Sequence, residues 1–273
     1  MKVAIQGIKG SNHHIVAEDY FKEPVSLEEC LSFDGLVDTL IEGKSDIGIM
    51  ALENTIAGSI IPNYALIDAN NLHIVGEYYL NIHHHLMGLE NQNLSDIHEV
   101  LSHPMALLQC KEFFRNHKNI KLVEDVDTAA VAKRISEQQL KNVAAIAPKT
   151  AADIYGLKVI EDEIQTIKEN ATRFVIVQTK PSAIKNKEIN KATIKFQLDH
   201  KRGSLAAILN VLSDCKMSLT KIQSLPVIET PWKYAFFVDV TFDALQQYEK
   251  AIAIITIMAE EFKVLGTYKS GRE

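Results

Sequence analysis

The sequence has few cysteines, and they form no pattern. Its 273 residues include three, Cys30, Cys110 and Cys215, which lie far apart and in apolar surroundings. An odd number of widely spaced cysteines argues against a disulfide framework or a cysteine-ligated zinc site and is typical of reduced thiols in a cytosolic protein. We therefore expect a cytoplasmic protein.

Long apolar runs and an excess of positive charge are also missing. No apolar run approaches the ~20 residues that cross a bilayer. Residues 1–7 lack the apolar core of a signal peptide and are typical of a strand. The net charge of -6 argues against nucleic acid or an anionic membrane as the main partner.

The glycine patterns of nucleotide-binding loops are absent as well. The first loop carries only Gly7 and Gly10, a spacing that fits neither the dinucleotide fingerprint nor the P-loop. This loop leads from a predicted strand into a predicted helix whose first amides Ser11 or Asn12 can cap. Unpaired amides at a helix start favour anions, so we predict a general anion site there.

The chain has enough apolar residues to fill several cores. With 47% hydrophobic residues in 273 positions, it fits two or three compact units. Strands and helices are predicted to alternate up to residue 177, which indicates mainly parallel sheets with helices on both faces. We predict helices over 13–21, 33–42, 62–69, 105–116, 129–139 and 149–155, and strands over 2–6, 46–52, 72–82, 99–104 (ending in a turn), 123–126, 143–147 and 174–177.

The last third of the chain has a different character. Residues 179–191 are polar, rich in lysine and interrupted by Pro181, which indicates a linker. The residues beyond it predict strand, helix, strand, strand, helix and strand, over 193–200, 204–215, 218–227, 234–242, 245–261 and 263–268. This βαββαβ order is the ferredoxin-like plan. No residue pattern in it is typical of catalysis, so we interpret it as a regulatory or assembly module.

Two polar clusters lie next to predicted buried strands. Thr172-Arg173-Phe174 opens the strand 174–177, where Arg173 could hold a carboxylate in bidentate fashion and Thr172 could give or take a proton. An ordinary surface ion pair of Arg173 is the alternative. Glu53-Asn54-Thr55 ends the strand 46–52, the edge at which open α/β sheets bind ligands. Capping and turn formation alone would also explain it.

Two further motifs contain histidine, and each allows more than one interpretation. His83-His84-His85 suggests a metal, but neighbours on a strand point to opposite faces, so at most two could share one ion. We therefore predict a polar, partly exposed strand and no metal. Ser102-His103-Pro104 precedes a helix with proline in its first turn, so His103 or Ser102 is a candidate helix cap.

Several stretches together resemble one family, the prephenate dehydratases with a C-terminal ACT domain. The catalytic part of that resemblance rests on Glu53-Asn54-Thr55 with Gly58, Ile74–Glu77, His84–Leu86, Ser102–Pro104 with Ala106, Leu107, Gln109 and Cys110, Thr128–Ala130, Ala151–Leu157 and Thr172–Phe174. In the tail, Leu219–Ile222, Phe236–Asp239 and Lys263–Tyr268 resemble the ACT segment. The match spans essentially the whole chain in the family's order.

The resemblance implies a fold and a reaction. It implies a two-lobed catalytic domain over 1–179, like a type 2 periplasmic binding protein, a linker over 180–192 and an ACT domain over 193–273. It also implies conversion of prephenate to phenylpyruvate in L-phenylalanine biosynthesis, with no cofactor. Prephenate carries two carboxylates, so its site needs cationic and amide donors. Because the chain starts at the first dehydratase-like strand, we expect no fused chorismate mutase segment.

The resemblance also implies roles for the polar clusters. Thr172 would act at the leaving hydroxyl, Arg173 would hold a carboxylate or order the cleft, and Phe174 would pack its wall. The remaining substrate-binding candidates are Gly10, Ser11, Asn12, Glu53, Asn54, Thr55, Gly58, Ser59, Ser102 and His103.

The effector segments of the tail depart from the family. Where relatives resemble Pro-Gly-Ala-Leu and Glu-Ser-Arg-Pro, this chain has Gly203-Ser204-Leu205 after Arg202, and Gln223-Ser224-Leu225-Pro226. A charge pair is thereby lost, but these residues remain the predicted site for L-phenylalanine. ACT domains commonly pair across subunits, which implies a homodimer or homotetramer. Two alternatives stay open: an arogenate dehydratase, and a non-catalytic ligand sensor.

Overall fold

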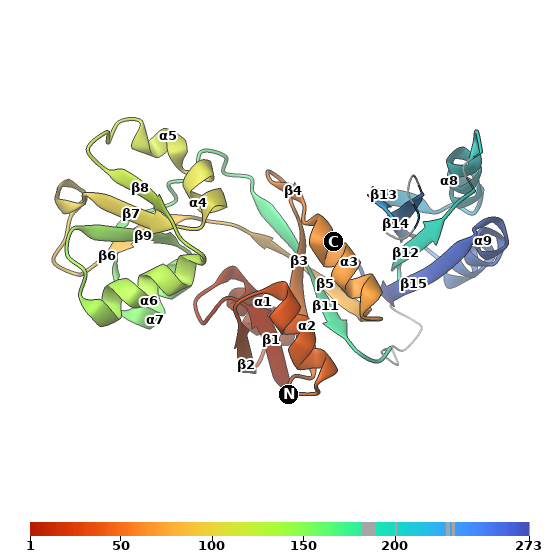
Figure 1. Cartoon of the computed structure of the whole chain (residues 1–273), viewed down its shortest axis with the longest axis horizontal. Coiled ribbons are helices and arrows are strands. Elements are labelled where there is room, and N and C mark those ends of the chain that lie inside the picture. Colours follow the sequence, from red (N-terminus) through yellow and green to blue (C-terminus); the bar gives the residue numbers. More distant parts are fainter. Residues whose placement is uncertain (182–188, 200, 228–229, 231–232, 273) are drawn as a thin grey trace. The chain divides into compact units, whose positions relative to one another are not determined.

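The computed structural model describes residues 1–181, 189–199, 201–227, 230 and 233–272 (Figure 1). The chain divides into two compact units. The first unit contains Met1–Ile60 and Tyr79–Phe174, and the second contains Ile61–Tyr78 and Val175–Glu273. The strands β5 (His73–Asn81) and β11 (Ala171–Gln178) each begin in one unit and end in the other.

The first sheet is built around the buried strand β1 (Lys2–Gln6). β1 pairs in parallel with β2 (Ser26–Cys30) and β3 (Ile47–Asn54), and β4 (Gly58–Ser59) folds back antiparallel onto the end of β3. The strand order of the sheet is β2-β1-β3-β11-β5. Helices α1 (Asn12–Phe21) and α2 (Phe33–Ile41) were both predicted, and serines at positions 11 and 32 cap them.

A second sheet in the first unit has the order β10-β6-β9-β7-β8. Its strands are β6 (His85–Gly88), β7 (Glu99–Ser102), β8 (Lys121–Glu124), β9 (Val143–Ala147) and β10 (Lys158–Glu161). β7 runs parallel to β8 and β9, whereas β6 runs antiparallel to β9 and β10. The prediction of mainly parallel sheets therefore holds for β7–β9 and was wrong for β6 and β10.

Helices cover both faces of this second sheet, as predicted. Alternate strand residues supply two separate cores. Leu86, Val100 and Ile146 pack with α4 (Pro104–Gln109) and α5 (Lys111–Phe114). Met87 and Ala145 pack with α6 (Thr128–Gln138) and α7 (Lys149–Tyr155). A short 3₁₀ helix, η1 (Leu94–Asp96), precedes β7.

Three local predictions need correction. The single helix predicted over 105–116 is two short helices, α4 and α5, joined at Cys110. The strands β2 and β10 were not predicted, because charged residues interrupt their short apolar patterns. The histidine run is not a partly exposed strand: β6 begins at His85, and both His84 and His85 are buried.

The second unit contains the predicted βαββαβ order. Its elements are β12 (Lys191–Gln197), α8 (Ser204–Asp214), β13 (Ser218–Pro226), β14 (Tyr234–Thr241), α9 (Leu245–Met258) and β15 (Glu261–Tyr268). The antiparallel sheet has the order β13-β14-β12-β15, and apolar residues of α8 and α9 fill its core. β12 begins inside the stretch predicted as a linker, 180–192, of which residues 182–188 lie outside the described part of the chain.

Two clusters of acids and lysines hold α3 (Ile61–Ala69) and the first part of β5 to this sheet within the second unit. Asp68 accepts from Lys195 at 2.6 Å and from Lys263 at 2.9 Å. Glu77 is fully buried on β5 and accepts from the Lys191 ammonium at 2.8 and 2.9 Å. Its carboxylate also accepts from the backbone N–H of Gly271 at 3.0 Å. Among the described residues, no helix is long and apolar enough to cross a membrane.

Candidate active site

A cavity of about 370 Å³ lies in the first unit and receives side chains from elements of both its sheets. Its lining mixes amide, hydroxyl and imidazole groups with aromatic and aliphatic walls, which is the composition of a small-molecule site. The lining residues are Gln6, Ser11, Asn12, His13, Phe33, Ala51, Asn54, Ala57, Ile60, Ile82, His84, His103, Met105, Ala106, Gln109, Val126, Asp127, Thr128, Thr172 and Phe174.

The start of β11 places two of the three predicted residues in this cavity. Side chains alternate along a strand, so Thr172 and Phe174 share one face and line the cavity. Arg173 is only 3% exposed and does not line it. Both roles expected of Arg173, holding a carboxylate and ordering the cleft, stay predictions, and its burial is compatible with the second.

Asn54, at the end of β3, fixes the Thr172 hydroxyl. The side-chain oxygen of Asn54 accepts from the backbone amides of Ile56 at 3.0 Å and Ala57 at 2.8 Å. Its side-chain nitrogen donates to the Thr172 hydroxyl oxygen at 2.9 Å and to the Asn170 side-chain oxygen at 2.6 Å. Thr172 accepts the bond from Asn54, so its own hydrogen remains available to a molecule in the cavity.

Buried imidazoles form part of the wall. The His13 ring meets the Phe174 ring edge-on, with 4.9 Å between ring centroids, and lies 5.6 Å from that of Phe33. Burial lowers the pKa of His13 to about 3, so the ring is neutral at physiological pH. Burial also lowers the pKa of His84, whose Nε2 lies 2.7 Å from the Gln109 side-chain oxygen.

Two helices, α1 and α6, begin at the cavity. Ser11 caps α1 by accepting from the His14 amide at 3.3 Å, and Asp127 caps α6 by accepting from the Ala130 amide at 2.7 Å. The first amides of both helices and their dipoles favour anions. No lysine or arginine of the described chain lines the cavity, so amides, and not the expected cationic side chains, are the donors available to carboxylates.

Asp127 introduces a negative group into the same cavity. Burial raises the pKa of its carboxyl group, and the backbone amides of Ala130 and Ala129 partly oppose that rise. A bound dianion would raise this pKa further, because like charges disfavour ionisation.

The structure separates the predicted residues into those that line the cavity and those that shape it. The lining group comprises Ser11, Asn12, Asn54, His103, Thr172 and Phe174. The predicted residues that do not line it are Gly10, Glu53, Thr55, Gly58, Ser59, Ser102 and Arg173.

Most residues of the second group have an observable structural role. Thr55 accepts from the Ala171 amide at 3.0 Å, which joins β3 to the start of β11. Gly58 and Ser59 form β4 opposite Asn54 and Glu53. Ser102 donates to the Ile146 carbonyl at 2.6 Å. These contacts fix the cavity walls without entering the cavity. In the lining group, His103 also caps α4 by accepting from the Met105 amide at 3.2 Å.

Sequence reasoning missed His13, His84, Gln109 and Asp127 as lining residues. Of these, His84 and Gln109 stand inside the stretches that carry the family resemblance, which was the available signal. The three adjacent histidines have separate partners: His83 lies 3.1 Å from Glu163, and His85 lies 2.5 Å from Asp162. They diverge, as alternation along an extended chain requires.

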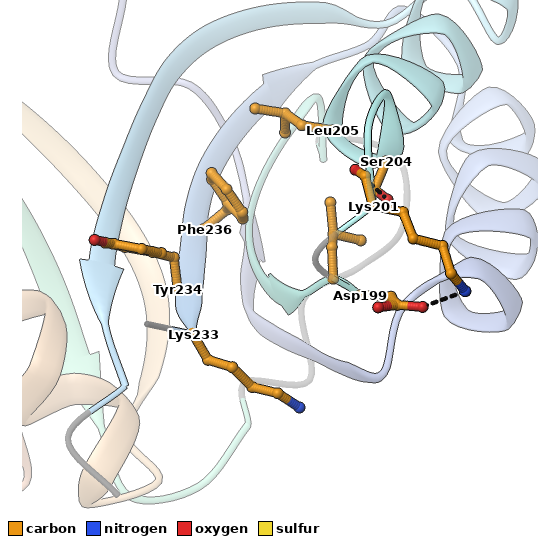
Figure 2. Close-up of a pocket in the computed structure, with 8 residues that line it drawn as sticks. Asp199, Lys201, Ser204, Leu205, Lys233, Tyr234 and Phe236 are labelled. Atoms are coloured by element: carbon orange, nitrogen blue, oxygen red, sulfur yellow. Dashed lines mark hydrogen bonds and ion pairs between the residues drawn. The ribbon is translucent and has the colours of Figure 1, made fainter. Parts of the chain in front are cut away.

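A smaller pocket of about 120 Å³ lies in the second unit between β12, α8 and β14 (Figure 2). Its lining residues are Leu198, Asp199, Lys201, Ser204, Leu205, Lys233, Tyr234 and Phe236. Figure 2 shows the Lys201 side chain turned toward Asp199, with which it forms an ion pair.

Part of the predicted effector site lies at this pocket. Ser204 and Leu205 line it, and Gly203 adopts a left-handed conformation, with φ of +85°, immediately before α8. The segment Gln223–Pro226 lies on β13, paired with residues 234–237 of β14, and does not line the pocket. The two predicted segments thus lie on different elements of one sheet-and-helix module.

The sequence comparisons identify one family, and the solved structures show its fold. The sequence model described as prephenate dehydratase matches residues 3–182. An arogenate dehydratase/prephenate dehydratase of Arabidopsis thaliana is 33% identical and covers 98% of this chain and 72% of that protein. A bifunctional chorismate mutase/prephenate dehydratase of Buchnera aphidicola is 31% identical over 97% of this chain and 70% of that protein. The crystal structure of a prephenate dehydratase from Arthrobacter aurescens in complex with L-Phe superimposes with a TM-score of 0.88 at 22% identity, covering 99% of this chain and 90% of that one.

Proposed function

The chain belongs to the prephenate dehydratase family, and from that membership we propose that its cavity converts prephenate to phenylpyruvate in L-phenylalanine biosynthesis. The bond from the ring to its carboxylate breaks, and its electron pair enters the ring. The ring hydroxyl leaves with its own bonding pair, and with one proton it becomes water. Carbon dioxide and phenylpyruvate are the other products, and formation of the aromatic ring drives the reaction.

The Thr172 hydroxyl is the observation that carries this proposal. Asn54 holds its oxygen and leaves its hydrogen free for a substrate, as a group that assists a departing hydroxyl requires. Thr172 donates to the leaving oxygen as the carbon–oxygen bond breaks, and solvent supplies the proton consumed overall. A ligand sensor has no need of a hydroxyl prepared in this way, so the geometry favours an enzyme.

The substrate carboxylates bind to amides in this proposal. The starts of α1 and α6 supply backbone N–H groups and the positive ends of two helix dipoles. The side chains of Ser11, Asn12 and Thr128 stand beside them and line the cavity. His13, Phe33 and Phe174 pack the ring from the apolar side, and the buried Arg173 orders β11 behind Thr172.

Arogenate is the second candidate substrate. It differs from prephenate in carrying an ammonium group where prephenate has a keto oxygen, and an arogenate dehydratase/prephenate dehydratase is among the relatives at 33% identity. The ring hydroxyl and ring carboxylate, where the bonds break, are the same in both compounds. Thr172 and the helix starts would therefore serve either one, and the ratio of kcat/KM values for the two compounds decides.

We also propose that residues 193–273 form an ACT regulatory domain, joined by a linker at 180–192 to a catalytic domain at 1–179. Its βαββαβ order supports this assignment, as does the likeness to a relative crystallised with L-Phe. L-Phenylalanine would bind near Ser204 and Leu205, where Asp199 and Lys201 offer one charge of each sign to a zwitterion. A cytoplasmic homodimer or homotetramer completes the proposal.

The test is phenylpyruvate formation by the purified protein from prephenate and, separately, from arogenate after transamination of the product. The prephenate assay is repeated with added L-phenylalanine. Turnover of prephenate that L-phenylalanine suppresses supports both the catalytic and the regulatory assignment. Turnover unaffected by L-phenylalanine supports the first and contradicts the second. Absence of turnover on both compounds by folded protein contradicts the catalytic assignment.

A further inference from the structure

Asp127 brings a carboxylate to the cavity without a cation beside it. Its side chain is among the lining residues, and no lysine or arginine of the described chain joins it there. The neighbouring Asp125 pairs with Arg134, whereas Asp127 has no ion pair with any residue that the structure describes. A negative group in a cavity for dianions needs an explanation.

The imidazoles of the cavity do not neutralise this charge. Burial lowers the pKa of His13 to about 3 and also lowers the pKa of His84. His103 accepts the Met105 amide through Nδ1 at 3.2 Å, and a ring nitrogen that accepts a hydrogen bond carries no hydrogen. The neutral form of His103 makes this contact, so Asp127 meets the interior of the cavity without a counter-ion.

The Asp127 carboxylate is held in place and remains within reach of a ligand. Its Oδ1 accepts from the Ala130 amide at 2.7 Å. Its Oδ2 lies 2.8 Å from the point where a Cβ on Gly7 would stand, and Cβ of Ser11 lies 3.3 Å from the same point. The carboxylate is therefore beside the end of β1 and the cap of α1. Asp127 is only partly buried and lines the cavity, so a ligand can contact it.

Asp127 and Thr172 lie at different positions along one sheet edge. Thr172 on β11 contacts Asn54 at the end of β3, whereas Asp127 lies against the end of β1. The strands β1, β3 and β11 are successive, so two strand spacings, ~10 Å, separate β1 from β11. In prephenate and arogenate the ring hydroxyl and the three-carbon side chain occupy opposite ring carbons. A substrate whose hydroxyl meets Thr172 can thus extend its side chain toward Asp127.

We propose that Asp127 is a specificity-determining residue whose carboxylate accepts a hydrogen bond from the ammonium group of arogenate and disfavours the keto group of prephenate. This inference rests on the proposed function. The two compounds differ only in that group. An ammonium donates hydrogen bonds, whereas a keto oxygen only accepts them and repels a carboxylate. The first amides of α1, next to Ser11, are placed to take the carboxylate of the same substrate side chain.

The substrate charge also acts on the pKa of Asp127. Burial raises that pKa; the amides of Ala130 and Ala129 and a protonated His103 oppose the rise, and Asp125 adds to it. A bound ammonium lowers the pKa and keeps the carboxylate charged, whereas the prephenate dianion raises it. Binding of arogenate therefore reinforces the charged form of Asp127, and binding of prephenate opposes it.

The experiment compares Asp127→Asn with the matched control Glu124→Gln. Asparagine caps a helix as well as aspartate does, so this change removes the charge and leaves an oxygen for the Ala130 amide. Glu124 is an exposed acid outside the cavity lining, and its replacement changes the net charge equally. Wild type and both variants are assayed for kcat/KM on arogenate and on prephenate, with far-UV circular dichroism to confirm folding. Asp127→Ser, which also keeps a capping side chain, replaces Asp127→Asn if that variant does not fold.

We expect Asp127→Asn to lower the ratio of kcat/KM for arogenate to kcat/KM for prephenate by about tenfold or more, as for the loss of a charged hydrogen bond in a binding site. An amide nitrogen in place of Oδ2 can donate to the keto oxygen, so prephenate should gain where arogenate loses. Glu124→Gln should change the ratio less than twofold. A purely structural role of Asp127 would lower both values together, and an unchanged or raised ratio would overturn the inference. A wild type that uses prephenate but not arogenate would also overturn it.

Binding separates this inference from the proposed function. In a Thr172→Val background, where turnover is slow, isothermal titration calorimetry gives the dissociation constants of arogenate and prephenate with Asp127 present or replaced by asparagine. The replacement should weaken arogenate binding, relative to prephenate binding, by about tenfold or more. A folded wild type that turns over neither compound would overturn the proposed function, and the same two dissociation constants would still decide the role of Asp127.

Discussion

The side-chain nitrogen of Asn54 donates to the Thr172 hydroxyl at 2.9 Å, although 118 positions separate the two residues in sequence. One residue ends β3 and the other lies near the start of β11, and these strands are neighbours in the sheet. The bond fixes where the Thr172 hydrogen can point. The chemistry of the cavity therefore depends on a register between two strands.

Replacement of Thr172 tests that chemistry directly. Thr172→Val keeps the shape of the side chain and removes its hydroxyl, so kcat should fall by about 10²- to 10³-fold, as for the loss of one donor to developing charge. Thr172→Ser keeps the hydroxyl and should retain far more activity. Steady-state kinetics of folded variants give the answer, and a Thr172→Val enzyme with wild-type kcat would exclude the assigned role.

Replacement of Asn54 should affect stability as well as activity. Asn54→Ala leaves the amides of Ile56 and Ala57 and the oxygen of Asn170 without their partner. We expect a loss of about 1–3 kcal/mol in the free energy of unfolding, the cost of unsatisfied buried groups, measured by urea denaturation. Asn70→Ala serves as a control, because its side chain makes only a local bond to the Leu66 carbonyl. Equal stability of Asn54→Ala and wild type would contradict the network.

His13 should make the protein less stable in acid. Its pKa is about 3 in the folded protein and 6.5 in the reference state, so the unfolded chain binds the proton more readily. Its contribution to stability is complete above pH 6.5 and falls, by up to about 1.4 kcal/mol per pH unit, as the pH drops toward 3. His13→Gln should flatten this part of the profile. Urea midpoints at pH 7.5, 6.5 and 5.5 measure the slope, and identical slopes would refute the prediction.

Replacing one member of the buried Glu77–Lys191 pair should destabilise the protein more, per change, than replacing both members together. Lys191→Met removes the ammonium that donates twice to the buried Glu77 carboxylate, and we expect a loss of about 3–5 kcal/mol. The double replacement Glu77→Leu with Lys191→Met should lose less than the sum of the single changes. A double-mutant cycle by thermal or urea unfolding measures the coupling, and additive losses would show that the pair is not coupled.

The predictions from sequence were best for helix caps and strands, which residues close together in the chain determine. Ser11 and His103 cap helices where capping chemistry placed them, and the apolar run 174–177 lies within a strand. Strand alternation, applied to Thr172-Arg173-Phe174, would also have set Arg173 apart from its neighbours, but the three were treated as one cluster. Local patterns thus identified the strand that reaches the cavity, while the direction of its side chains required the strand register.

The remaining part of the site depends on contacts between distant positions. Gln109 contacts His84 across 25 positions and Asn170 across 61, and no local pattern predicts such pairs. The expectation of cationic donors followed from substrate charge alone, whereas the folded chain brings helix starts to the cavity instead. Backbone amides at helix starts can therefore take the place of cationic side chains toward an anion, and the residue composition gives no sign of them.

The location of Glu77 and Asp68 has a consequence for truncation. Both belong to the stretch Ile61–Tyr78, yet their lysine partners come after residue 190. A shortened protein that stops near residue 179 would lack the lysines that donate to Asp68 and to the buried Glu77. Deleting the tail would therefore also weaken β5, the strand that leads toward Ile82 in the cavity wall. Any such shortened form should therefore carry uncharged side chains in place of Asp68 and Glu77.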